Sequence, residues 1–337
     1  MEPPDIPLGV YTHINFAFAS IDPKVFRIRP TTNNTAKRYF GVTALTDKQP
    51  GLKVYISLGG WDFNEPGPTR NTFSDLAASE SAQDMFFDSL ISFMTHNAFD
   101  GVDLDWEYPW ADDRGGRPED LVNFVTLLKR LRQRLTQGPM QFGLTITVPA
   151  TYWYLRGFDL ANLEPHVDWF NVMTYDIHGL WDADGKEIGN RAYAHTNLTE
   201  ITLGLELFWR NNINPERVVM GLGFYGRSFK LEDPKCLAPG CRDDVETLKL
   251  KIDYANKRCL GGTMVWAVDL DDGTLSDALG KAMNKTKIDP IKDPYAIAPC
   301  FGSPWPKWSN KTWLGNNTKD WLVLPGNNTE DIPDEEW

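Results

Sequence analysis

The sequence of 337 residues contains little cysteine, no apolar run long enough to span a bilayer, and fewer basic than acidic residues. With 34 Lys and Arg against 46 Asp and Glu, its net charge is -12. Because phosphate binding needs a basic surface, this charge argues against nucleic acid, and equally against an anionic membrane, as the main partner. A neutral partner such as a sugar is compatible with it. The first residues lack the basic and apolar regions of a secretory signal, so we expect none in this sequence.

Only four cysteines are present, and none has histidine partners at the spacing of a zinc site. An even number permits two disulfides in three possible pairings, and the sequence does not choose among them. The G-x-G-x-x-G fingerprint of dinucleotide-binding folds is also absent from the turns after the first strands. We therefore predict no metal and no cofactor. The cysteines are Cys236, Cys241, Cys259 and Cys300.

The sequence does contain an alternation of short apolar runs and amphipathic segments, which predicts parallel strands joined by helical crossovers. In one such segment Phe124, Leu128 and Leu131 repeat at helical spacing. Helices are predicted at Ala77–His96, Pro118–Leu135, Thr199–Trp209 and Val245–Arg258. Strands are predicted at Tyr11–Ser20, Leu52–Gly59, Gly101–Glu107, Phe142–Val148, Trp169–Tyr175, Val218–Tyr225 and Thr263–Val268.

Several of these strands end in polar or aromatic residues, such as Tyr175 and Asp176. Chemistry gathered at the carboxyl ends of strands is typical of (β/α)8 barrels, so we predict an α/β fold of the TIM-barrel class. Only seven strands can be counted, which predicts an incomplete barrel. We assign residues 1–286 to this domain. Residues 287–337, rich in Trp, Asn and Pro, are expected to form a poorly ordered tail, with an aromatic surface that contacts polysaccharide as the alternative.

The most informative segment is D-G-V-D-L-D-W-E-Y-P, Asp100–Pro109, which places Asp103, Asp105 and Glu107 at alternate positions. On a strand these carboxylates point to one face, whereas the intervening apolar residues point to the other. Burial of ionised carboxylates is costly, so a strand that aligns three of them indicates chemistry. A metal site is the rival interpretation. Residues at i and i+4 on a strand lie roughly 13 Å apart, however, which is too far for all three to ligate one ion.

Six segments resemble, in family order, those of glycoside hydrolase family 18, the chitinases. Their amino-acid sequences are most similar to those of the fungal members, and the resemblance extends over roughly residues 8–285. The decapeptide is the most specific of the six. The segments are Tyr11–Phe18, Val54–Trp61, Asp100–Pro109, Met173–Gly179, Gly223–Phe229 and Met264–Asp269.

The resemblance implies hydrolysis of the β-1,4 linkages between the N-acetylglucosamine units of chitin. In the family's substrate-assisted mechanism, the 2-acetamido oxygen of the sugar attacks its own anomeric carbon, and configuration is retained. By position in the motif, Glu107 is the general acid and later the base. The resemblance makes Asp105 the residue that holds the acetamido N–H and Tyr175 the residue that holds its carbonyl. Asp103, deeper on the strand, is expected to share a proton with its neighbours.

Further residues match the family's substrate-binding positions. Trp266 matches the aromatic floor beneath the sugar at the cleavage point, and Trp61 matches a stacking residue on the leaving-group side. Without the resemblance, such residues have an ordinary structural interpretation as core, strand end or surface ion pair. The implied substrate-binding set is Trp61, Tyr108, Met173, Asp176, Tyr225, Arg227 and Trp266.

Two features depart from the family pattern. Only about ten residues precede the segment Tyr11–Phe18, so the family's first barrel strand is expected to be missing. The connection from Phe229 to Val245 is too short for the small α+β domain that such members insert before the last strand. An open barrel leaves two strand edges unpaired, which is costly.

These departures keep other functions open. The chain is a chitinase, a catalytically weak or inert chitin-binding and lectin-like remnant, or an endo-β-N-acetylglucosaminidase that cleaves N-glycan cores. Because lectin-type relatives typically lose the acid, the presence of Glu107 favours the enzyme. The expected partner is chitin or its oligosaccharides, and family resemblance predicts an extracellular location. The expected state is a monomer, although no sequence pattern bears on oligomerisation.

Overall fold

A computed structural model describes residues 1–184, 189, 193–227 and 245–287. Cys236, Cys241 and Cys300 lie outside these residues, as does the predicted tail apart from its first residue. Cys259 is exposed, with a free thiol. Within the described part of the chain, no helix has the length and apolar character that crossing a membrane requires.

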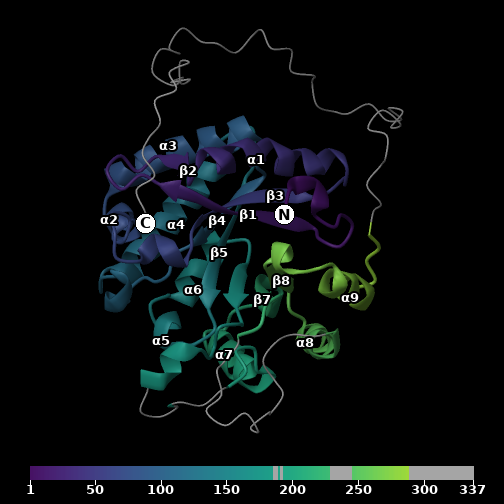
Figure 1. The fold of residues 1–337 in the computed structure, drawn as a ribbon. Helices are drawn as coiled ribbons and strands as arrows, with labels where there is room; N and C mark the ends of the chain where they lie inside the picture. The colour runs from purple at the N-terminus through teal and green to yellow at the C-terminus, as the bar shows by residue number, and fades with distance from the viewer. Residues whose placement is uncertain (185–188, 190–192, 228–244, 288–337) are drawn as a thin grey trace, which may run out of the picture. The chain divides into compact units, whose positions relative to one another are not determined.

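An eight-stranded sheet forms the centre of the fold (Figure 1). Seven strands are parallel and lie side by side in chain order, at the places that the sequence predicts. The eighth, β2 (Ile28–Pro30), pairs antiparallel with β1 and was not predicted, because three residues are too few to show a period. The parallel strands are β1 (His13–Ile21), β3 (Lys53–Gly59), β4 (Gly101–Asp105), β5 (Gly143–Pro149), β6 (Phe170–Met173), β7 (Val218–Gly223) and β8 (Gly262–Trp266).

Helices lie outside the sheet and connect its strands (Figure 1). The hydroxyl of Ser79 begins one of them, α3, by accepting a hydrogen bond from the N–H of Ala82. On α4 the apolar positions that repeat at helical spacing are buried, among them Phe124 and Leu128. The helices are α1 (Asn33–Thr43), α2 (Thr72–Ala77), α3 (Glu80–Asn97), α4 (Asp120–Leu135), α5 (Tyr152–Leu155), α6 (Leu160–Leu163), α7 (Leu198–Arg210), α8 (Val245–Lys257) and α9 (Thr274–Ala282).

The interior strands carry the core, whereas the two outer parallel strands are only partly covered. Every residue of β4 is buried, but none is buried in β8, and only Ala19 and Ile21 are buried in β1. Within the described residues β1 and β8 do not pair with each other, so the sheet is open between them. Side chains approach across this opening, where the rings of Phe18 and Trp266 lie 5.6 Å apart. The sheet is therefore open, as the count of seven parallel strands predicts.

Candidate active site

The three carboxyl groups of the segment Asp100–Pro109 lie at the end of β4 and just beyond it. Asp103, Asp105 and Glu107 are all buried, each with at most 7% of its surface exposed. Between the last two, Trp106 points into the core, where its ring stacks on Phe73 with 5.3 Å between centroids. The alternation of this segment therefore separates a polar face from an apolar one, as the sequence predicts.

Asp103 is the innermost carboxyl group, and four side chains donate hydrogen bonds to it. Thr145 Oγ1 and Asn171 Nδ2 lie 2.6 and 3.0 Å from its Oδ1. Thr147 Oγ1 and Ser57 Oγ lie 3.0 and 3.2 Å from its Oδ2. Burial raises the pKa of Asp103, and these four hydrogen bonds lower it. The group is thus fixed in place with both oxygens satisfied.

Asp105 contrasts with this arrangement. Its Oδ1 is buried and has no hydrogen-bond partner among the described residues. Burial, and then the nearby charges of Glu107 and Asp103, raise its pKa well above the ordinary value. Buried polar atoms of native proteins are nearly always paired, so an unpaired carboxyl oxygen at a strand end is suited to receive a ligand N–H.

Glu107 lies two residues beyond the end of β4. Burial raises its pKa to about 7, although a hydrogen bond with Tyr108 and the positive charge of Arg114 act in the opposite direction. Its backbone N–H donates to Asn64 Oδ1 at 3.3 Å, which ties it to the loop after β3. Near neutral pH much of Glu107 is therefore protonated, the state that a general acid needs.

Sequence reasoning missed Arg114, which is buried and holds the surroundings of Glu107 together. Its Nε donates to the carbonyl oxygen of Glu107 at 3.1 Å, and its Nη2 to that of Trp61 at 2.5 Å. Its Nη1 forms an ion pair of 2.6 Å with Glu65. The guanidinium also lies 3.6 Å from the centroid of the Trp61 ring. The local sequence Asp112-Asp113-Arg114 resembles a solvated charged turn, so no sequence pattern predicts that Arg114 is buried or that it contacts Glu107.

A charged pair lies at the ends of β6 and β7. Arg227 Nε, after β7, donates to Oδ1 of Asp176, after β6, at 2.6 Å. Burial raises the pKa of Asp176, but its hydrogen bonds with His195 and Arg227 outweigh burial and bring the pKa to about 2. Asp176 is thus ionised wherever Glu107 titrates, and its negative charge contributes to the raised pKa of Glu107.

Tyr175 and His195 complete this side of the site. Tyr175 is buried, and its hydroxyl lies 3.9 Å from the sulfur of Met264. Burial, followed by the charge of Asp105, raises the pKa of Tyr175 well above its usual range, so its hydroxyl keeps its proton. Sequence reasoning missed His195, because an isolated histidine carries no pattern. It is 1% exposed and bridges the two strand ends, with Nε2 3.1 Å from the carbonyl oxygen of Tyr225 and Nδ1 3.2 Å from the backbone nitrogen of Asp176.

The other predicted residues lie at the same edge of the sheet. Trp61 follows β3 and Trp266 ends β8, and both rings are exposed. Tyr108 is buried and stacks on Tyr154 with 4.2 Å between centroids, and Met173 is half-buried at the end of β6. The peptide bonds that follow Glu107 and Trp266 are both cis. The structure therefore brings all of the predicted site residues to the carboxyl ends of the strands.

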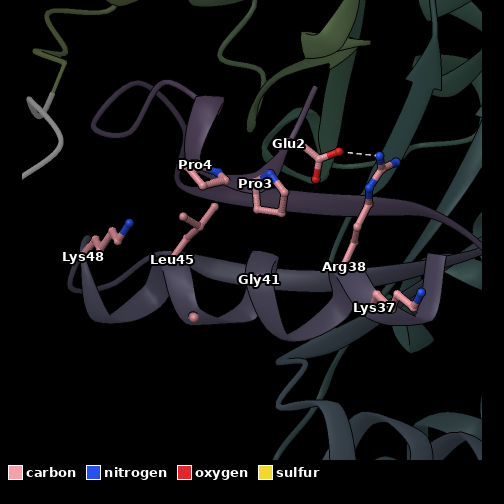
Figure 2. Close-up of a pocket in the computed structure, with 9 residues that line it drawn as sticks. Glu2, Pro3, Pro4, Lys37, Arg38, Gly41, Leu45 and Lys48 are labelled. Atoms are coloured by element: carbon pink, nitrogen blue, oxygen red, sulfur yellow. Dashed lines mark hydrogen bonds and ion pairs between the residues drawn. The ribbon is translucent and has the colours of Figure 1, made fainter. Parts of the chain in front are cut away.

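A surface pocket elsewhere on the protein contains none of these residues. It lies between the short 3-10 helix Pro3–Asp5 and α1, where Glu2 and Arg38 form an ion pair of 2.5 Å (Figure 2). Lys37 and Lys48 also line it. Glu2 is the one carboxyl group in its lining, so this pocket offers no paired acids, and the strand ends remain the candidate active site.

Comparison with known proteins identifies the family. The profile of Glycosyl hydrolases family 18 matches residues 2–237. The chain belongs to glycosyl hydrolase family 18. Secreted chitinase LysM12 of Penicillium expansum is 31% identical over 245 residues, which are 69% of this chain and 16% of that protein. The killer toxin subunits alpha/beta of Kluyveromyces lactis are 33% identical over 245 residues, 72% of this chain and 20% of that protein.

Another relative, an endochitinase of Manduca sexta, is 30% identical over 239 residues, which are 67% of this chain and 42% of that protein. The family 18 chain thus spans less than half the length of each of these three relatives.

Solved structures of family 18 proteins share the fold. Catalytic domain 2 of the Group II chitinase of Ostrinia furnacalis has a TM-score of 0.74 at 24% identity, and covers 86% of this chain and 93% of that one. The chitinase-like agglutinin of Robinia pseudoacacia has a TM-score of 0.71 at 23% identity, covering 84% and 96%. A mutant chitinase of Cycas revoluta in complex with (GlcNAc)4 has a TM-score of 0.73 at 23% identity, covering 84% and 96%. At these identities the likeness shows the TIM-barrel type of fold, of which this open sheet is a variant.

Proposed function

We propose that this family 18 chain is a chitinase, which hydrolyses β-1,4 linkages between N-acetylglucosamine units. One observation carries the proposal. Glu107, with a pKa of about 7, is the next carboxyl group after Asp105 in the alternating set of three. The buried Oδ1 of Asp105 has no partner among the described residues. A protonated acid beside an unsatisfied acceptor suits a substrate that presents a glycosidic oxygen and an amide N–H together.

In the proposed reaction, Glu107 donates its proton to the departing glycosidic oxygen. Asp105 accepts a hydrogen bond from the acetamido N–H of the sugar, and the hydroxyl of Tyr175 donates to the acetamido carbonyl group. This oriented amide oxygen attacks the anomeric carbon of its own sugar and forms an oxazolinium ion. Glu107, now ionised, removes a proton from the water that opens this ring. Two displacements on one carbon leave its configuration unchanged.

Substitution of Glu107 tests the proposal. Glu107→Gln keeps the shape of the side chain but cannot donate the proton, so turnover of chitooligosaccharides should fall by about 10²–10⁴-fold, the usual contribution of general acid catalysis. Binding of the same oligosaccharides, measured by calorimetry, should persist. Glu119→Gln, at an exposed carboxylate before α4, is the matched control. Unchanged turnover in Glu107→Gln would refute the assignment.

A lectin-like function is the second candidate. It is favoured by the opening between β1 and β8 among the described residues, which leaves the barrel incomplete, and one protein of the same fold, from Robinia pseudoacacia, is named a chitinase-like agglutinin. Release of soluble oligosaccharides from chitin by the purified chain separates an enzyme from a lectin. A parallel assay on a glycoprotein separates cleavage of chitin from cleavage of N-glycan cores. An extracellular location follows from the proposed substrate, and one relative is named a secreted chitinase.

A further inference from the structure

The loop that follows β6 contains a buried cluster of charged groups that the proposed reaction does not use. His178 is 6% exposed and Asp182 is 8% exposed. Nδ1 of His178 lies 3.0 Å from Oδ2 of Asp182, in the same loop. Nε2 of His178 lies 2.8 Å from Oε1 of Glu200, in the first turn of α7. We call His178, Asp182 and Glu200 the histidine cluster.

The two contacts of the ring fix the number of protons in this cluster. A hydrogen bond between a ring nitrogen and a carboxyl oxygen needs one proton, so the two bonds need two. Either both ring nitrogens of His178 carry a proton, or the ring is neutral and one carboxyl group is protonated. Oδ2 of Asp182 also accepts the backbone N–H of Gly179 at 3.1 Å, and Glu200 stands at a helix amino terminus, where negative charge is stabilised. The geometry therefore favours an imidazolium between two carboxylates.

The histidine cluster closes a turn and ties it to a helix. Asp182 accepts the N–H of Gly179 on its side chain and donates its own N–H to the carbonyl oxygen of Gly179 at 3.2 Å. The bond from His178 to Glu200 then joins this turn to α7. Oε2 of Glu200 is buried and has no hydrogen-bond partner among the described residues, so within that part of the chain His178 is what holds the Glu200 side chain.

The same turn carries a side chain that reaches the candidate active site. The ring of Trp181 lies so close to Gly179 that a Cβ atom there would meet it at 2.3 Å. The guanidinium carbon of Arg227 lies 4.6 Å from the centroid of the Trp181 ring. Arg227 in turn donates to Asp176, which precedes His178 by two residues. The contacts thus run from the histidine cluster through Trp181 and Arg227 back to Asp176.

We infer that His178 is a positioning residue for the proposed reaction, which holds Asp176 and Arg227 in place by bridging Asp182 and Glu200. The inference rests on the proposed function, and it goes further in assigning a role to a buried side chain that takes no part in the chemistry. The alternative is an ion cluster that only stabilises the fold. Breaking the bridge would then lower Tm without any specific effect on Asp176.

The test breaks the bridge at its helix end. Glu200→Ala removes the contact, whereas Glu200→Gln keeps it, because an amide both donates and accepts hydrogen bonds. Glu206→Ala is the matched control, since Glu206 lies on the same helix and forms a surface ion pair of 3.7 Å with Arg210. Each variant is made in the wild-type chain and in Asp176→Asn. Thermal denaturation confirms that each one folds, and turnover is measured well below the lowest Tm.

The expected result is a loss of turnover that depends on Asp176. In Glu200→Ala, kcat on short chitooligosaccharides should fall at least about tenfold, because a displacement of about 1 Å in a site can cost about a hundredfold. Glu200→Gln should retain most of the wild-type kcat, and Glu206→Ala should match the wild type. In the Asp176→Asn chain, Glu200→Ala should lower kcat by at most about twofold, because the group through which the bridge acts is already altered.

A spectroscopic readout does not depend on activity. The Nε–H of Arg227 donates to Asp176, so its NMR signal, assigned with Arg227→Lys, reports on that pair. The signal should shift in Glu200→Ala and stay in place in Glu200→Gln. If Glu200→Ala does not fold, His178→Asn takes its place, because the shorter amide keeps a donor for Asp182 and cannot reach Glu200.

Three outcomes would overturn the inference and leave the proposed function intact. They are a wild-type kcat in Glu200→Ala, an equal loss in both Glu200 variants, and an equal loss with and without Asp176→Asn. If the wild-type chain turns over no chitooligosaccharide, the proposed function fails. The Arg227 signal then still decides whether the bridge holds the pair, and a signal unchanged by Glu200→Ala would refute that.

Discussion

Glu107 couples the chemistry of the site to the stability of the protein. Its pKa is about 7 in the folded chain against an ordinary value of 4.5. Between these values the folded protein keeps a proton that the unfolded chain releases, so the free energy of unfolding falls as pH rises from about 4.5 to about 7.

Glu107→Gln should therefore stabilise the protein at alkaline pH. A neutral amide carries no such penalty, so the gain at pH 8 should reach up to about 3 kcal/mol, shrink as the pH falls from about 7 to about 4.5, and vanish below that. The measurement is Tm against pH for both proteins, with the exposed Glu246→Gln as control. A difference in Tm that stays constant from pH 4 to pH 8 would contradict the raised pKa.

Arg114 offers a second prediction at this scale. Arg114→Gln removes a positive charge that lowers the pKa of Glu107, so the alkaline limb of the pH–activity profile should move to higher pH. It also removes donors to the carbonyl groups of Glu107 and Trp61, and stability should fall by about 1–3 kcal/mol. Arg114→Lys keeps the charge, so its alkaline limb should stay in place even if KM rises. Identical pH profiles for wild type and Arg114→Gln would contradict the electrostatic part of this role.

Sequence reasoning found the residues of the site that stand in a pattern, and missed those that act through distant contacts. Asp103, Asp105 and Glu107 stand at alternate positions in the sequence, and this spacing is visible without a structure. Arg114 acts on a loop that lies 53 residues away in the chain, and His195 on one that lies 30 residues away. Such contacts depend on which loops the folded sheet brings together, so no local pattern encodes them.

At the scale of elements, side chains from the two strands that pair with β4, and from β6 on the far side of β5, bind Asp103. Ser57 on β3 and Thr145 on β5 stand beside Asp103 in the strand register, one on each side. Asn171 reaches the same carboxyl group from β6. The register of the parallel strands therefore determines which polar side chains meet the carboxyl group, and a slip of one residue would turn them away.

Thr145→Val tests this arrangement with little change in side-chain shape. It deletes a donor at 2.6 Å from a fully buried carboxyl group, so the free energy of unfolding should fall by about 1–3 kcal/mol. Thr263→Val on β8 is the matched control, because within the described part of the chain the hydroxyl of Thr263 makes one weak hydrogen bond, to the sulfur of Met283 at 3.9 Å. Chemical denaturation measures both. Equal losses in the two variants would show that the hydrogen bond to Asp103 contributes nothing specific.

The elements themselves were predicted unevenly. All seven parallel strands were found, because each contains a short apolar run bounded by turn residues, including β1 and β8, which are only partly covered. The sequence did not reveal β2, α2, α5 or α6, which have between three and six residues each, or the nine-residue α9. It also did not reveal α1, whose stretch Asn33–Thr43 is largely polar and begins at the side-chain cap of Thr32. Where packing against neighbouring elements stabilises a short helix or strand, its own residues show little propensity or periodicity from which to predict it.

At the scale of the whole molecule, stability should be graded from the centre of the sheet to its open edges. The residues of β4 and nearly all of those of β5 are buried, whereas β8 is covered only in part. Native-state hydrogen exchange should show the slowest amides in β4 and β5 and the fastest strand amides in β8, because local opening follows burial. Uniform protection across all seven parallel strands would show that the open edges are covered in solution.

The opening between β1 and β8 also bears on how this protein folds. In the parallel sheet each strand pairs with the strand that is next to it in the chain, so no pairing has to join residues 13–21 to residues 262–266. Among the described residues, the backbone pairing that joins the two ends of a barrel is therefore absent, which lowers the mean sequence separation of the native contacts. Side chains still meet across the opening, where Phe18 lies beside Trp266 and the hydroxyl groups of Tyr11 and Ser276 are hydrogen-bonded at 3.0 Å. Folding rates rise as that separation falls. The backbone hydrogen bonds of the sheet can therefore form between strands that are neighbours in the chain, and the side-chain contacts across the opening are the ones that need the two ends to meet.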